Sequence, residues 1–127
     1  MSINVQIYNH TARIVMSDRF DFHVHRDFKN AYAPLLDNAA VHEIEIEMSK
    51  LAYMDSAALG MLMLLYERAK SANKCVVLCN PSNVVATLFE VANFDRIFNI
   101  RNMASSNMEG RKSVYGNLMP EVVPAAT

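Results

Sequence analysis

The sequence predicts a single α/β domain in which strands alternate with helices. Residues 43–48 (EIEIEM) alternate acidic and apolar side chains, and residues 74–79 (KCVVLC) form a β-branched apolar run. Both patterns are typical of strands. Between them, residues 56–72 carry apolar side chains at helical spacing. Strands that alternate with helices indicate a layered α/β domain with right-handed crossovers, and a length of 127 residues favours one compact unit.

The overall composition excludes several classes of protein. Hydrophobic residues make up 52% of the chain, which is enough for a core, and the formal net charge is only -1. No dense group of Lys and Arg predicts a nucleic-acid or anionic-membrane surface, and no apolar run approaches the roughly 20 residues of a membrane span. The N-terminus lacks the basic-then-apolar layout of a signal peptide. We therefore expect a cytoplasmic protein without a nucleic-acid or membrane partner.

The first third of the chain predicts a hairpin followed by a helix. Residues 4–7 (NVQI) and 12–16 (ARIVM) read as short strands, with a turn at residues 9–10. A helix is predicted over residues 24–37, where apolar side chains recur at helical spacing, namely Phe28, Ala31, Tyr32, Leu35 and Leu36. Pro34 lies inside this segment and should kink the helix, because proline has no backbone N–H to donate.

The EIEIEM strand predicts two chemically different faces. Its apolar side chains share one face and its acidic side chains share the other, the latter being Glu43, Glu45 and Glu47. Alternation of this kind usually places the charged face in water. The acidic face would also suit a sheet edge, where charge discourages unwanted strand pairing.

A helical wheel of residues 56–72 separates a core face from an outward face. The core face holds Ala58, Leu62, Leu65, Tyr66 and Ala69, with Met61 and Ala72 at its margin. Gly60 lies on the opposite, polar face, and Met63 and Leu64 fall on or beside that face. Exposed apolar side chains there would suit a partner surface. A neighbouring helix or the C-terminal segment would cover them equally well.

The last third of the chain predicts one further helix and a short strand. Asn80-Pro81 ends the KCVVLC strand, and a helix follows over residues 82–92 with Ser82 as its cap. Residues 94–100 (FDRIFNI) predict a final short strand. From Arg101 the periodicity fades. We therefore expect a domain over residues 1–100 and a mobile C-terminal tail over residues 101–127, with or without a short helix.

Asp55 and Ser56 stand between the strand that ends near Tyr53 and the helix that starts near Ala57. Both residue types are favoured at helix starts, where their oxygens accept otherwise unpaired backbone N–H groups. The same position also suits a phosphorylated serine, because a helix N-terminus holds anions. A phosphate there would be repelled by Asp55 and would change the surface strongly. Capping and modification both remain open at this point.

Other candidate sites are weaker. His23 and His25 could form a pair of metal ligands, but zinc normally needs three or four. No Gly-x-Ser-x-Gly surrounds Ser56 and no glycine-rich phosphate loop is present, so we expect neither an enzyme nor a cofactor. Cys75 and Cys79 on one strand would lie about 13 Å apart, too far for a disulfide. We interpret them as reduced core thiols of a reducing compartment.

Residues 50–70, KLAYMDSAALGMLMLLYERAK, resemble the signature segment of STAS domains, the fold of bacterial anti-sigma-factor antagonists. In that family a strand ends in an apolar-Asp-Ser-Ser-Gly-Leu-Gly stretch that opens a helix. Here the stretch reads MDSAALG, residues 54–60. The order of elements over residues 3–100 is also similar. The resemblance implies a mixed sheet of four or five strands with helices packed mainly on one face.

The resemblance further implies regulation by partner switching. Ser56 would be phosphorylated by a partner serine kinase that doubles as an anti-sigma factor, and a serine phosphatase would reset it. The unphosphorylated form would bind its partner through a surface comprising Asp55, Ser56, Ala57, Gly60, Met63 and Leu64. The alternative is a constitutive STAS scaffold or interaction subunit in which Ser56 only caps the helix.

Two departures from the family pattern accompany the resemblance. Ala57 and Ala58 replace the usual second serine and first glycine, and alanine is the better helix former. The helix start should therefore be stiffer than usual. Residues 17–21 (SDRFD) stand where the family often begins a loop with glycine, so we expect that loop to have a different shape.

Overall fold

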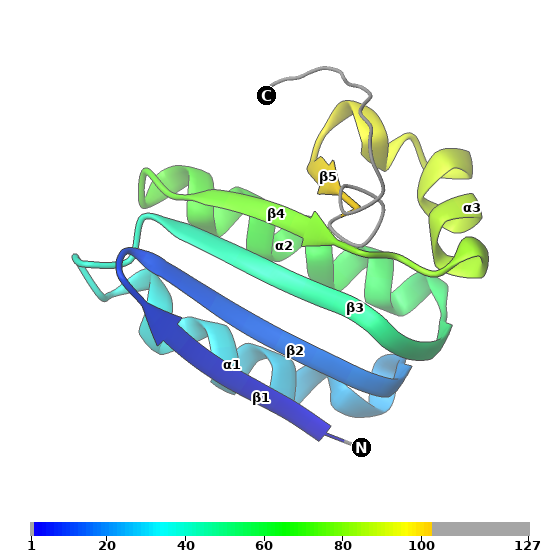
Figure 1. Cartoon of the computed structure of the whole chain (residues 1–127), viewed down its shortest axis with the longest axis horizontal. Coiled ribbons are helices and arrows are strands. Elements are labelled where there is room, and N and C mark those ends of the chain that lie inside the picture. The colour runs from blue at the N-terminus through cyan, green and yellow to red at the C-terminus, as the bar shows by residue number, and fades with distance from the viewer. Residues whose placement is uncertain (1, 103–127) are drawn as a thin grey trace.

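The computed structural model describes residues 2–102 of the chain. In this part of the chain, five strands form one sheet in the order β1-β2-β3-β4-β5 (Figure 1). Strands β1 and β2 pair antiparallel and the other neighbours pair parallel. The strands are β1 (Ser2–Tyr8), β2 (Thr11–Phe20), β3 (Glu43–Met54), β4 (Cys75–Cys79) and β5 (Asn99–Arg101). The predicted mixed α/β sheet is confirmed, with five strands.

Within residues 2–102, three α-helices accompany the sheet. They are α1 (His25–Leu36), α2 (Ser56–Ser71) and α3 (Asn83–Val91), with 3-10 turns at η1 (Phe22–Val24) and η2 (Phe94–Arg96). Helices α1 and α2 lie on one face of the sheet, and α3 lies beyond the end of β4 (Figure 1). The predicted one-sided packing is therefore confirmed. None of the helices in residues 2–102 has the length and apolar character needed to cross a membrane.

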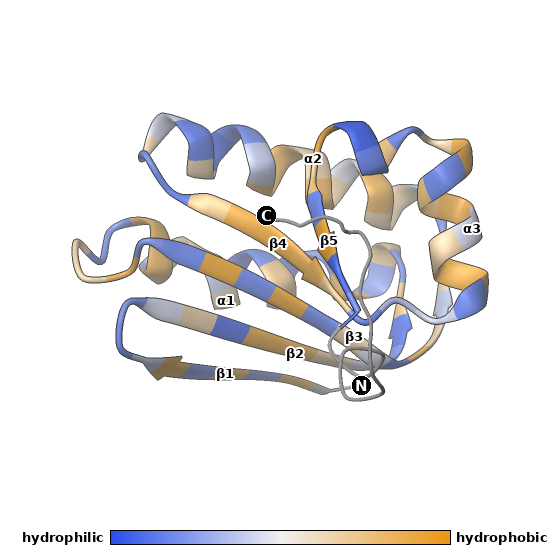
Figure 2. Ribbon diagram, turned by 45° about the horizontal axis from the view of Figure 1, so that its top comes forward, coloured by the Kyte–Doolittle hydropathy of each residue, from blue (hydrophilic) through white to orange (hydrophobic). Residues whose placement is uncertain are grey.

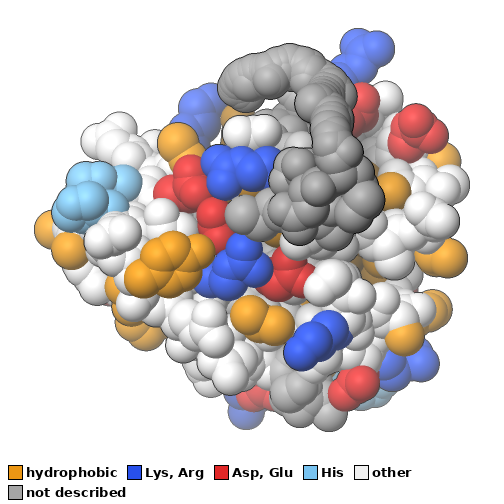
Figure 3. All heavy atoms as spheres, in the orientation of Figure 1, with side chains coloured by type: hydrophobic (Ala, Val, Ile, Leu, Met, Phe, Trp, Pro, Cys, Tyr) orange, Lys and Arg blue, Asp and Glu red, His pale blue; other side chains and the backbone are white. Residues whose placement is uncertain are grey.

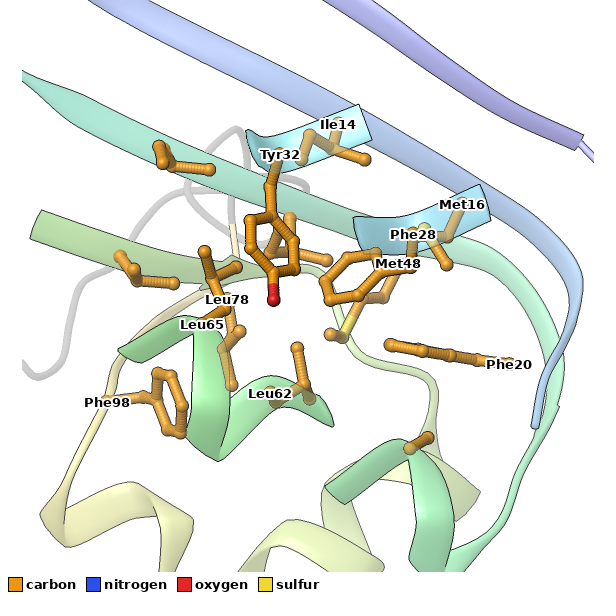
Figure 4. Packing of buried hydrophobic residues seen from close by; sticks show 14 of the residues in the cluster. Ile14, Met16, Phe20, Phe28, Tyr32, Met48, Leu62, Leu65, Leu78 and Phe98 are labelled. Atoms are coloured by element: carbon orange, nitrogen blue, oxygen red, sulfur yellow. The ribbon is translucent and has the colours of Figure 1, made fainter. Parts of the chain in front are cut away.

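The hydrophobic core lies between the sheet and helices α1 and α2 (Figures 2 and 4). The core face predicted for α2 is confirmed for Ala58, Leu62, Leu65 and Ala69, which are fully buried, while Tyr66 is half-buried. Aromatic rings from α1 and β2 pack in the same layer (Figure 4). The Phe28 ring centroid lies 5.0 Å from that of Phe20 and 5.2 Å from that of Tyr32.

Two segments differ from the predicted boundaries. Strand β2 continues to Phe20, so residues 17–20 belong to a strand and not to a loop, and their register against β3 shifts on the way. The strand predicted in residues 94–100 is largely the η2 turn followed by β5, because the backbone N–H groups of Ile97 and Phe98 both donate to the Phe94 carbonyl and the chain turns there, with Phe94 and Phe98 buried. Beyond its first two residues, the predicted tail 101–127 lies outside the described residues.

The acidic face of β3 is neither in water nor at a sheet edge, so that prediction is wrong. Strand β3 is central, and Glu45 and Glu47 are only 4% and 6% exposed. The Arg13 guanidinium lies 3.2 Å from a Glu45 oxygen and 3.3 Å from a Glu47 oxygen. Arg101 pairs with Glu45 at 3.2 Å and with Glu43 at 3.3 Å. Figure 3 shows these opposite charges gathered on the helix-free face of the sheet.

Candidate functional site

At the junction between β3 and α2, the side chains of Asp55 and Ser56 differ in their hydrogen bonding. Asp55 has an extended backbone, and its Oδ1 accepts a hydrogen bond from the backbone N–H of Ala58 at 3.0 Å. This is the geometry of an N-cap. Ser56 is the first helical residue and is exposed, and its hydroxyl forms no hydrogen bond within residues 2–102. Asp55 therefore caps α2, and the Ser56 hydroxyl takes no part in that cap.

The surroundings of Ser56 suit a phosphate. The first backbone N–H groups of a helix have no partner within the helix, and the helix dipole places partial positive charge there. A phosphate on Ser56 would bring a charge of about -1.5 to -2 to this end. The carboxylate of Asp55 is the adjacent side chain, so the phosphate would also meet like charge. Modification would therefore change the local potential without removing any packing in the core.

The exposed side of α2 continues from Ser56 through Gly60 and Leu64, at intervals of one helical turn. Leu64 is 44% exposed. A Cβ added to Gly60 would meet no atom within 4 Å, so packing inside the described structure does not require a glycine there. Ala57 is partly exposed beside this stripe. Met63 is half-buried and packs against the core, so it adds less apolar surface than the wheel suggested.

The end of β2 lies beside the same junction. The backbone N–H of Asp55 donates to the carbonyl of Phe20 at 3.3 Å, which joins the two strand ends. Two residues later, Phe22 is 62% exposed and its ring stacks on His25 with centroids 4.9 Å apart. Sequence reasoning did not single out this aromatic side chain. It adds an exposed apolar group to the end of the molecule that carries Ser56.

A second feature missed from the sequence is a cation–π pair at the same end. The Arg19 guanidinium lies 4.3 Å from the centre of the Tyr53 ring, and these two residues are register partners on β2 and β3. Arg19 also donates to Asp21 at 3.1 Å. Together with the N–H of His23, this contact holds the pKa of the Asp21 carboxyl below its usual range. Asp21 thereby fixes the turn that exposes Phe22.

The two histidines of this turn each have a local partner. His23 Nδ1 lies 3.5 Å from Asp21 Oδ1, and His25 Nδ1 lies 3.2 Å from the carbonyl oxygen of Phe22. Within residues 2–102, no three side chains among His, Cys, Asp and Glu are arranged to hold a metal ion.

The two cysteines have different environments. Cys79 is fully buried, and its burial raises the pKa of its thiol to about 12. It therefore stays protonated at neutral pH. Cys75 at the start of β4 is exposed, so the interpretation of both cysteines as core thiols is wrong for this residue. Both are free thiols.

A mixed five-stranded sheet with a serine-bearing strand-to-helix junction is the architecture of an STAS-type domain. A family model described as "Mlab, STAS domain" matches residues 3–102. The chain belongs to the STAS domain family. It is also 35% identical, over 89 residues, to a STAS-domain containing protein of Pseudomonas aeruginosa, an alignment that covers 68% of this chain and 84% of the relative.

Solved structures show the same fold at low sequence identity. A putative anti-sigma factor antagonist of Thermotoga maritima superposes with a TM-score of 0.73 at 20% identity, covering 84% of this chain and 91% of that one. The anti-sigma factor antagonist SpoIIAA in its unphosphorylated form gives 0.68 at 18% identity, covering 78% and 87%. The phosphorylated form of SpoIIAA, a Bacillus cell fate determinant, gives 0.64 at 17% identity, covering 78% and 90%. These likenesses confirm the predicted fold.

Proposed function

We propose that this chain is a non-enzymatic bacterial partner-switching regulator of the anti-sigma-factor-antagonist type. Its switch is Ser56, phosphorylated by a partner serine kinase that doubles as an anti-sigma factor and dephosphorylated by a serine phosphatase. The observation that carries the proposal is that Asp55 and Ser56 make different contacts at the start of α2. Asp55 supplies the cap, so the exposed Ser56 hydroxyl is available to accept a phosphate without loss of the helix start.

The proposed partner surface is the part of this junction that a docked protein would touch first. It comprises Asp55, Ser56 and Ala57 at the start of α2, and Gly60, Met63 and Leu64 along the helix. The empty space around Gly60 supports it, because a side chain is absent where packing within the described residues would allow one. A glycine in the interior of a helix lowers stability by roughly 0.5–1 kcal/mol relative to alanine. Close approach by a partner backbone would account for its presence.

The electrostatic change is large enough for a switch. Burying or repelling one phosphate across an interface costs on the order of a few kcal/mol, and each 1.4 kcal/mol changes affinity about tenfold. The unphosphorylated form would therefore hold a micromolar partner that the phosphorylated form releases. A constitutive scaffold of the same fold would show no such dependence on Ser56.

The proposal is tested by measuring phosphate on the intact chain recovered from the bacterium that produces it. We expect intact-mass spectra to contain a species heavier by one phosphate, and fragmentation to place the group on Ser56. The Ser56→Ala variant should lack that species, whereas a control such as Ser71→Ala should keep it. A wild-type chain without phosphate under both growth and starvation would contradict the switch and favour a constitutive interaction subunit.

A further inference from the structure

Strand β1 forms one edge of the sheet, and no segment within residues 2–102 pairs with its outer side (Figures 1 and 2). Its sequence, SINVQIY, has seven residues and contains neither a charge nor a proline. Natural sheets usually protect such edges with charge, proline or short length. The opposite edge follows that rule, because β5 has three residues and ends at Arg101, which is held in ion pairs. Among the described residues, nothing gives the β1 edge equivalent protection.

The hairpin geometry determines which backbone groups of β1 point outward. A two-residue turn joins Tyr8 to Thr11, and the residues that flank such a turn exchange hydrogen bonds. Bonded and non-bonded pairs then alternate along an antiparallel ladder. Tyr8, Gln6 and Asn4 therefore bond to β2. The N–H and C=O groups of the remaining residues point away from the sheet, and these residues are Ile3, Val5 and Ile7.

The same three residues share one face of the strand, because successive side chains alternate between faces. Ile3 packs against the core, but Val5 and Ile7 are 38% and 52% exposed. A strand added to this edge would satisfy the outward backbone groups and cover these apolar side chains in one step.

We propose that β1 pairs antiparallel with β1 of a second copy of this chain, with Val5 opposite the Val5 of that copy. The register is self-complementary, because it also sets Ile3 opposite Ile7 and Asn4 opposite Gln6. The three bonded pairs contribute about six hydrogen bonds. The strand lacks charge, so no like-charge repulsion opposes the pairing. The two-fold axis is perpendicular to the sheet, so the helices of both copies lie on one face of a continuous sheet.

The pairing does not depend on the switch at Ser56, which is the first residue of α2 and follows β3, a strand two positions away from β1 in the sheet. A dimer of this kind displays two Ser56 sites on one assembly. The interface is short, so we expect a dimer whose population rises with concentration and not a permanent one.

Sedimentation equilibrium of the full chain tests the proposal. The weight-average mass should rise from 14.3 kDa toward twice that value as concentration increases to the millimolar range. Val5→Lys sets two like charges opposite each other and should keep the chain monomeric. Val5→Pro removes only an outward N–H, which an edge strand tolerates, and should act in the same way. Val84→Lys, on an α3 position that is 72% exposed, is the matched control and should leave the dimer intact.

A cross-linking experiment fixes the register. Opposed residues of a bonded antiparallel pair have Cα atoms about 5.5 Å apart, a distance compatible with a disulfide. In a Cys75→Ser background, Val5→Cys should form a disulfide-linked dimer on mild oxidation, and Val84→Cys should not. A wild-type chain whose weight-average mass stays that of the monomer at millimolar concentration would overturn the proposal. So would a dimer that persists in Val5→Lys, or a Val5→Cys yield no greater than that of Val84→Cys.

Discussion

The carboxylate of Asp55 accepts a hydrogen bond from the backbone N–H of Ala58 at 3.0 Å and so completes the first turn of α2. This contact identifies Asp55 as the cap, whereas the sequence alone left both Asp55 and Ser56 as candidates for capping. Asp55 stabilises the helix start, and Ser56 stands exposed immediately after it. The stability of the fold and the chemistry of the serine can therefore be changed independently.

Removing the side-chain oxygen should lower the stability of the fold at Asp55 but hardly at Ser56. We expect Asp55→Ala to lower the free energy of unfolding by about 1 kcal/mol, and Ser56→Ala to change it by less than about 0.5 kcal/mol. Urea denaturation measures both, with Asp55→Asn as the control that keeps a capping oxygen. A loss for Ser56→Ala equal to that for Asp55→Ala would mean that the serine hydroxyl is part of the cap.

Gly60→Ala should make the protein more stable and a poorer partner. The added methyl group meets no atom within 4 Å, and alanine favours a helix interior over glycine by roughly 0.5–1 kcal/mol. We therefore expect a higher urea midpoint together with less partner protein retained on the immobilised variant. Leu62→Ala, in the core, is the contrasting change and should lose about 2–5 kcal/mol. A lower stability of Gly60→Ala would show that packing inside the domain requires a glycine at this position.

The sequence predicted the layered fold because its strands and helices differ clearly in hydrophobic period. It missed features that arise only from tertiary contacts. The acidic residues of β3 looked solvent-facing, but their partner Arg101 lies more than fifty positions away along the chain. Phe20 was expected to lie in a loop, and no role was assigned to Phe22. Phe20 is fully buried and Phe22 is 62% exposed, because Asp21 ends the strand and begins a turn.

The candidate site was predicted in part for a similar reason. Gly60 and Leu64 are four residues apart, so helical geometry placed both on or beside the outward face of the helix that starts at Asp55-Ser56. The wheel could not show that Met63 packs against the core. Nor could a linear pattern assign the cap, since Asp and Ser are both good capping residues and only their positions relative to Ala58 distinguish them.

The ion-pair network on the helix-free face should be essential to stability. Arg13→Met leaves Glu45 and Glu47 largely buried with one fewer positive charge, so we expect a loss of about 2–4 kcal/mol in the free energy of unfolding. Adding Glu45→Leu to this variant should restore part of the lost stability, because the charges of both Arg13 and Glu45 are then removed. Chemical denaturation of the two single variants and the double variant gives the coupling energy. Strictly additive effects would contradict a direct pair.

Stability should fall as the solution becomes acidic. Burial alone would raise the pKa of Glu47, but hydrogen bonds from Ser49 and Asn80 outweigh it and hold that pKa below the usual 4.5. The pKa of Asp21 is also lowered from 3.8, mainly by Arg19. The unfolded chain therefore binds more protons in this range. These contributions are complete above about pH 4.5 and are lost as pH falls through the lowered values. Urea unfolding across a pH series should show the decline, and Glu47→Gln should reduce its slope.

The charge on residue 56 should decide whether the proposed partner stays bound. This is measured by comparing the proteins that co-purify with tagged wild type, Ser56→Ala and Ser56→Asp from cells of the organism that produces the chain. We expect one protein to be retained by Ser56→Ala at least as well as by wild type and to be lost from Ser56→Asp, while circular dichroism shows all three chains folded. Equal retention of that protein by all three chains would contradict a switch at Ser56.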